Sequence, residues 1–132
     1  MAHKILLIDD DLTNVTLIQN RLQAHHYVVN VAHDGDEGLA AVTTQKPDMI
    51  ILDVEMPRMN GYTFMTELRK LPSEFQAIPV LVLTAHAEHQ PIFGLKRIKG
   101  YIVKPIQIEA LLEKILKYLG PNVPPDQKPN PA

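Results

Sequence analysis

Four short runs of the chain are apolar at every position. They are residues 5–8 (ILLI), 49–52 (MIIL), 80–83 (VLVL) and 101–103 (YIV). Unbroken apolar runs of this length are typical of parallel strands, because helices cover both faces of a parallel sheet. A fifth segment, 27–32 (YVVNVA), is rich in β-branched residues but has one polar position, which favours a strand at an edge of the sheet. The pattern therefore predicts a parallel sheet of five strands.

Helical periodicity lies between the runs that predict strands. Apolar residues three or four positions apart share one face of a helix. The residues with this spacing are Leu12, Val15, Ile18 and Leu22 in one segment, Phe64, Met65, Leu68 and Leu71 in a second, and Ile108, Leu111, Leu112, Ile115, Leu116 and Leu119 in a third. Residues 35–45 form a weaker helical pattern, which ends before Pro47.

One further helix is expected before the last strand, but its sequence restricts its length. Pro91 is tolerated in a first helical turn and not inside a helix, and Gly94 weakens the pattern. This fourth helix should therefore run only from near Pro91 to near Ile98. Strands and helices then alternate five times, which predicts an α/β fold with a doubly wound, five-stranded parallel sheet and five helices, the fourth of them short.

Length and composition fit one globular domain with a short tail. The chain has 132 residues, of which 45% are hydrophobic and 21% charged, so residues 1–120 are expected to form a single domain. Residues 121–132 contain five prolines and are expected to be a tail or truncated linker without packed structure. The chain has no cysteine, which excludes disulfides and thiolate metal sites.

Charge and hydropathy also limit the partners. A formal net charge of -2 gives no general attraction to nucleic acid or to an anionic membrane, so neither is an expected partner. The apolar run at 5–8 is too short for a signal peptide and ends in charged residues. No segment approaches the roughly 18 apolar residues of a membrane span. A cytoplasmic protein is therefore expected.

Polar residues follow the predicted strands directly. Asp9 and Asp10 follow the first strand, Asp53 the third, Thr84 the fourth and Lys104 the fifth. The carboxyl ends of parallel strands meet at one edge of a sheet, where open α/β folds bind ligands. Clustered carboxylates repel one another unless a cation offsets their charge, and oxygen ligands favour Mg²⁺. A lysine beside such a site suits a second anion, so the residues predict a site for Mg²⁺ and a phosphoryl group.

Four segments, in this order, resemble the receiver domain of two-component response regulators. They are ILLIDDD (5–11), MIILDVEMPRMNGYTF (49–64), VLVLTA (80–85) and GYIVKP (100–105). The resemblance extends from residue 4 to about residue 119 and implies the flavodoxin-like strand order 2-1-3-4-5. It also implies a signalling protein that assists its own phosphorylation and dephosphorylation, rather than an enzyme acting on a separate substrate.

The resemblance assigns roles to individual residues. Asp53 would accept a phosphoryl group from the phosphohistidine of a histidine kinase or phosphotransfer protein. Asp10, Asp53 and the backbone carbonyl of Glu55 would coordinate Mg²⁺, while Asp9 would hold a water molecule bound to the metal or orient Asp10. The side chains of Glu55 and His86 would flank the site and affect how readily water reaches the acyl phosphate.

A switch between two conformations is also implied by the resemblance. Thr84 and Lys104 would bind oxygens of the phosphoryl group, and the bond between Lys104 and Pro105 would be cis. Thr84 and Tyr101 would then move together and alter the surface formed by the fourth helix, the fifth strand and the fifth helix. That surface would bind a downstream protein target, and the chain would be a monomer or a weak homodimer.

Two other interpretations remain open. Asp9, Asp11 and Thr13 fit the D-x-D-x-T signature that resembles haloacid-dehalogenase-like phosphatases, in which Asp9 would be the nucleophile and Asp11 the general acid. That family places further metal-binding acids on a strand after the lysine, and no acidic residue after Lys104 lies on a predicted strand. The second alternative is a receiver-like scaffold that binds partners without being phosphorylated. In the receiver interpretation, Asp11 instead caps the first helix.

Overall fold

A parallel sheet of five strands forms the centre of the computed structural model, which describes residues 3–54, 61–85 and 98–119. Its strands are β1 (Lys4–Ile8), β2 (Val28–Ala32), β3 (Met49–Asp53), β4 (Val80–Thr84) and β5 (Ile98–Val103). Each strand is parallel to its neighbours, in the order β2-β1-β3-β4-β5. The predicted doubly wound sheet and its strand order are confirmed, with β2 at an edge.

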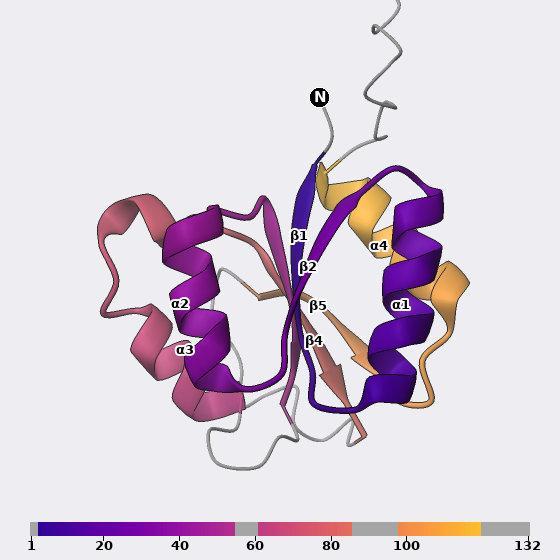
Figure 1. Cartoon of the computed structure of the whole chain (residues 1–132), viewed down its shortest axis with the longest axis horizontal. Helices are drawn as coiled ribbons and strands as arrows, with labels where there is room; N and C mark the ends of the chain where they lie inside the picture. The colour runs from indigo at the N-terminus through magenta and orange to yellow at the C-terminus, as the bar shows by residue number, and fades with distance from the viewer. Residues whose placement is uncertain (1–2, 55–60, 86–97, 120–132) are drawn as a thin grey trace, which may run out of the picture.

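Helices cover both faces of this sheet (Figure 1). The helices α1 (Leu12–Ala24) and α4 (Ile108–Leu119) lie on one face, and α2 (Gly35–Gln45) and α3 (Gly61–Leu68) lie on the other. A short 3-10 helix, η1 (Ser73–Phe75), precedes β4 and is not predicted by the sequence pattern. The helix predicted from Pro91 falls almost entirely outside the described residues, so α4 is the helix predicted as the fifth. No described helix is both long and apolar enough to cross a membrane.

The two faces of the sheet form separate apolar clusters. In β1, Ile5 and Leu7 pack in the cluster beneath α1 and α4, whereas Leu6 and Ile8 pack in the cluster beneath α2 and α3. All four side chains have no exposed surface. Successive residues of a strand point to opposite faces of a sheet, so the interior positions of a strand covered on both sides favour apolar residues. This preference explains the unbroken apolar runs of the sequence.

Aspartates begin the helices that follow β1 and β2. Oδ1 of Asp11 accepts hydrogen bonds from the backbone amides of Thr13, at 2.9 Å, and Asn14, at 3.4 Å. Oδ1 of Asp34 accepts one from the amide of Glu37 at 2.8 Å. These bonds satisfy amides that the first turn of a helix leaves without a partner. The predicted capping role of Asp11 is therefore confirmed.

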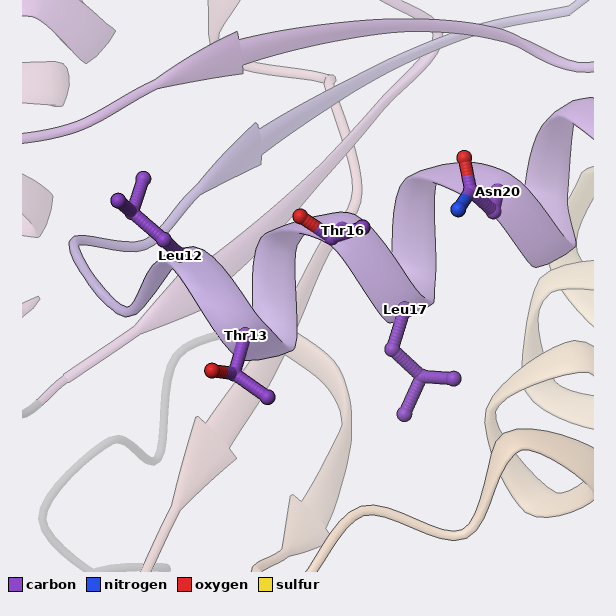
Figure 2. A pocket seen from close by; sticks show the side chains of 5 residues that line it. All are labelled: Leu12, Thr13, Thr16, Leu17 and Asn20. Carbon is purple, nitrogen blue, oxygen red and sulfur yellow. The ribbon is translucent and has the colours of Figure 1, made fainter.

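The prediction for the buried face of α1 is wrong at its first residue. The spacing groups Leu12 with the buried residues Val15, Ile18 and Leu22, but the side chain of Leu12 is 68% exposed. Side chains of a helix point toward its N-terminus, so the side chain of its first residue extends past the helix end into solvent. An open cavity of about 530 Å³ on the outer surface of α1 (Figure 2) is lined by Leu12, Thr13, Thr16, Leu17 and Asn20.

The strand β5 begins earlier than the sequence predicts. The apolar run at 101–103 predicts only its last three positions, whereas the strand begins at Ile98, where the preceding helix was expected to end. Val80 pairs with Ile98 and Leu81 pairs with Gly100, which leaves one additional residue in β5 between these pairs. Such a bulge interrupts the strand pattern locally, so the polar start of β5 does not resemble a strand in the sequence.

Candidate functional site

Three aspartates meet at the carboxyl ends of β1 and β3. One carboxylate oxygen from each of Asp9, Asp10 and Asp53 lies within 4.8 Å of the other two. Asp9 and Asp53 are buried, whereas Asp10 is exposed. Ile8 of β1 pairs with Leu52 of β3, so the residues that follow these positions lie side by side. The structure thus brings together the three carboxylates that the sequence predicts at one site.

Asp9 is fixed by its neighbours, but one of its oxygens has no hydrogen-bond partner among the described residues. Its backbone amide donates to the carbonyl oxygen of Ala32 at 3.0 Å, and its Oδ1 accepts a hydrogen bond from the amide of Asp11 at 3.0 Å. Its Oδ2 is buried and has no hydrogen-bond partner in the described part of the chain. A buried carboxylate oxygen without a donor costs free energy, so this position calls for a cation or for water bound to a cation.

The surroundings of Asp9 favour its neutral form when no cation is bound. Burial is the largest cause that raises the pKa of the Asp9 carboxyl from 3.8 to about 7, and the neighbouring carboxylate of Asp53 acts in the same direction. The amide of Asp11 and the ammonium group of Lys104 oppose this rise. Because a metal ion binds the ionised carboxylate, cation affinity at this site should increase with pH.

Lys104 directly follows β5, so it approaches Asp53 from the side of the sheet away from Asp9 and β1. Its Nζ is 3.1 Å from Oδ1 of Asp53, and the two groups form a partly buried ion pair. Its backbone amide donates to the carbonyl oxygen of Thr84 at 2.7 Å, and the bond to Pro105 is cis. Thr84 is buried at the end of β4, and Tyr101 is half-buried against the cluster beneath α2 and α3. A coupled movement of Thr84 and Tyr101 stays a prediction.

The donor set fits Mg²⁺. All candidate ligands are oxygens, two of the three carboxylates are buried, and one buried oxygen of Asp9 has no hydrogen-bond donor in the described residues. Hard cations with oxygen ligands, Mg²⁺ above all, match this chemistry. Glu55 and His86, which are predicted to supply a carbonyl ligand and to flank the site, lie outside the residues that the structure describes.

Sequence reasoning missed one contact at this site. It assigned Asp11 only to the cap of α1, but the backbone amide of Asp11 also donates to the carboxylate of Asp9. An aspartate that bonds the amide two positions later forms an Asx turn. The spacing of Asp9 and Asp11 is compatible with such a turn, although many aspartate pairs with this spacing form none.

The sequence matches the model of the response regulator receiver domain over residues 5–116. The chain belongs to this family. Receiver domains are signalling proteins of two-component systems, so the family match decides against the phosphatase alternative. The matched residues include the acidic residues at the ends of β1 and β3 and also Lys104 after β5.

Named relatives extend this comparison. The receiver domain is 37% identical over 122 residues to the alkaline phosphatase synthesis transcriptional regulatory protein PhoP of Bacillus subtilis, a match that covers 89% of this chain and 50% of PhoP. The chain therefore spans about half the length of this regulator.

Two solved structures have the same fold over nearly their whole length. The chemotaxis response regulator CheY4 of Vibrio cholerae has a TM-score of 0.79 and 31% identity, covering 89% of this chain and 99% of CheY4. The response regulator TrrA of Thermotoga maritima, solved in complex with Mg²⁺-BeF, has a TM-score of 0.77 and 28% identity, covering 88% of this chain and 98% of TrrA.

Proposed function

We propose that this receiver domain accepts a phosphoryl group on Asp53 in the presence of Mg²⁺ and thereby controls the binding of a downstream protein. The observation that carries the proposal is the position of Asp53. Its carboxylate is 1% exposed, lies beside Asp9 and Asp10, and has Nζ of Lys104 at 3.1 Å. An acceptor carboxylate between a cation site and a lysine suits the transfer of a group with several negatively charged oxygens.

The donor in this proposal is a phosphohistidine of a histidine kinase or phosphotransfer protein. An oxygen of Asp53 forms a bond to phosphorus as the phosphorus–nitrogen bond to the donor histidine breaks, which gives an acyl phosphate and releases the imidazole. Lys104 then pairs with a phosphoryl oxygen, and the hydroxyl of Thr84 binds another. Thr84 ends β4, which lies next to β3, and Lys104 follows β5, which lies next to β4. The sheet therefore holds both residues in position for the transfer.

Asp10, Asp53 and the backbone carbonyl of Glu55 would hold Mg²⁺, and Oδ2 of Asp9 would accept a hydrogen bond from a metal-bound water. When bound, Mg²⁺ neutralises negative charge on the phosphoryl oxygens. The Mg²⁺-BeF complex of the relative TrrA supports this assignment, as does the unpartnered Oδ2 of Asp9 within the described residues. Coordination also relieves the repulsion among the three carboxylates.

The response to phosphorylation is proposed to run from Thr84 to Tyr101. Both residues lie on neighbouring strands, and Thr84 pairs with Val103, two positions after Tyr101. Movement of Thr84 toward the phosphoryl group would open space for the Tyr101 ring and change the surface around β5 and α4. We further propose that residues 1–120 act as the receiver and 121–132 as a tail or linker, in a cytoplasmic protein that is a monomer or weak homodimer.

Incubation with acetyl phosphate tests this function directly. With Mg²⁺, intact-mass spectrometry should show one added phosphoryl group, which disappears when a chelator removes the metal. The Asp53→Asn variant should show none, and peptide mapping of the wild-type protein should place the group on Asp53.

The matched control is Asp48→Asn, at the residue that precedes β3. Asp48 is exposed and its Oδ2 accepts a hydrogen bond from the amide of Lys4 at 2.7 Å, so it lies away from the cluster of carboxylates. This variant should be phosphorylated like the wild type. Absence of any adduct on the wild-type protein with Mg²⁺ would refute phosphorylation and favour the scaffold alternative.

A further inference from the structure

Asp11 is bonded both to the candidate metal site and to the first turn of α1. Its backbone amide donates to Oδ1 of Asp9 at 3.0 Å. Its own Oδ1 accepts from the amides of Thr13, at 2.9 Å, and Asn14, at 3.4 Å. The carbonyl oxygen of Asp11 also accepts the first helical hydrogen bond, from Val15 at 2.9 Å. Asp11 is thus held to the helix by three hydrogen bonds and holds Asp9 by one.

The bond between Asp9 and Asp11 encloses Asp10 in an Asx turn. The side chain of Asp10 is exposed and makes no hydrogen bond or ion pair within the described part of the chain. Among the described residues no group holds this carboxylate, so its direction toward Asp9 and Asp53 depends on the conformation of Asp10 itself. The backbone of Asp10 is fixed on one side by Asp9, at the end of β1, and on the other by Asp11.

We infer that Asp11 is a positioning residue for the metal site, in addition to capping α1. Its carboxylate fixes the backbone of Asp11 on the helix, the amide of Asp11 then holds the Asp9 carboxylate, and the turn between them directs Asp10 toward the cation. The inference rests on the proposed function, because it requires Mg²⁺ at this site. It assigns the two oxygens of Asp9 different tasks, with Oδ1 holding the turn and Oδ2 facing the cation position.

Three neutral substitutions of Asp11 separate position from charge and from stability. Asp11→Asn, Asp11→Ala and Asp11→Gly all remove the same negative charge. Asparagine caps a helix about as well as aspartate, alanine caps poorly, and glycine caps with little loss of stability although it has no side-chain acceptor. If Asp11 positions the metal ligands, the Mg²⁺ affinity of Asp11→Gly should resemble that of Asp11→Ala. If Asp11 acts only through stability, the affinity of Asp11→Gly should resemble that of Asp11→Asn.

The experiment measures the Kd for Mg²⁺ by calorimetric or amide-shift titration, with thermal unfolding to show that each variant is folded. The Kd of Asp11→Ala and of Asp11→Gly should each be about 10-fold weaker than that of Asp11→Asn, as for other residues that orient metal ligands. Hydrogen exchange of the residue 11 amide should be faster in the same two variants, because its bond to Asp9 is loosened.

Asp34 provides the matched control, since it caps α2 through a 2.8 Å bond to the amide of Glu37 and is not one of the clustered carboxylates. Asp34→Ala and Asp34→Asn should have equal Kd values for Mg²⁺. A loss of affinity in Asp34→Ala equal to that in Asp11→Ala would overturn the inference, because any lost cap would then suffice.

Equal Mg²⁺ affinity of the three Asp11 variants would also overturn the inference, while leaving the proposed function intact if Asp10→Asn abolishes binding. If the wild-type protein does not bind Mg²⁺, or if Asp10→Asn binds it as tightly, the proposed metal site is wrong and the positioning role is wrong with it.

Discussion

Raising the pH in the absence of Mg²⁺ should weaken the folded state, because Asp9 must then carry a buried negative charge. The side chain of Asp9 has no exposed surface, and its Oδ2 has no hydrogen-bond donor among the described residues. Burial raises its pKa to about 7 in the folded protein, compared with 3.8 for an unperturbed aspartate. Between these two values the folded state binds more protons than the unfolded state, so the free energy of unfolding falls as the pH rises.

The size of this effect follows from the pKa difference. One pKa unit corresponds to about 1.4 kcal/mol of differential stability. The stabilisation of the folded state by neutral Asp9 is fully present below about pH 4 and decreases as the pH rises to about 7. Above that value it does not change further. Between about pH 5 and about pH 7.5 the free energy of unfolding should fall by on the order of 3 kcal/mol on account of this residue.

Urea unfolding followed by circular dichroism, at both pH values and with a chelator present, measures this loss. Asp9→Asn is the control variant, because asparagine retains an oxygen that accepts from the amide of Asp11 but does not ionise. The two proteins differ only at residue 9, so the contributions of groups remote from this residue cancel in the difference. The wild-type protein should lose stability across this range relative to Asp9→Asn. Equal losses in the two proteins would refute the assignment of the buried charge to Asp9.

Two substitutions test the packing of the clusters. Gly38→Ala should lower the free energy of unfolding, measured by urea denaturation, by about 1–3 kcal/mol. A Cβ atom there would lie 2.7 Å from Cδ1 of Ile8 and 3.1 Å from Cε1 of Phe64. A gain in stability, as alanine usually gives in a helix, would contradict this contact. Tyr27→Phe should leave the free energy of unfolding unchanged or raise it by up to about 1 kcal/mol, because the buried hydroxyl has no hydrogen-bond partner in the described residues. A clear loss of stability would show that the hydroxyl is bonded.

The central strands could be predicted from the sequence because one physical requirement determines their composition. Strands covered on both faces favour apolar residues, and the runs at 5–8, 49–52 and 80–83 are accordingly apolar up to the polar residues at the carboxyl ends of the strands. Edge and irregular segments are under weaker constraint. The start of β5 includes a lysine and a glycine around its bulge, so its polar pattern gives no strand signal even though it pairs with β4.

Much of the candidate site could also be predicted, because it depends on topology. Parallel strands place their carboxyl ends together, so Asp9, Asp10 and Asp53 had to converge once the strands were recognised. Hydrogen bonds inside the turn after β1 depend on local backbone angles, which apolar periodicity does not specify. The bond from the amide of Asp11 to Asp9, and the oxygen of Asp9 that remains without a donor in the described residues, could therefore be found only in the structure.

The separation of the apolar residues into two clusters has a consequence for how such a domain diversifies. The cluster around Ile18 and the cluster around Phe64 have no residue in common, and the sheet lies between them. Energetic effects of substitutions that share no partner usually add. Either helical layer can therefore be redesigned, or can drift in evolution, without matching changes in the other. The strands β1, β3 and β4 each supply fully buried side chains to both clusters, so they are the segments in which such changes are most restricted.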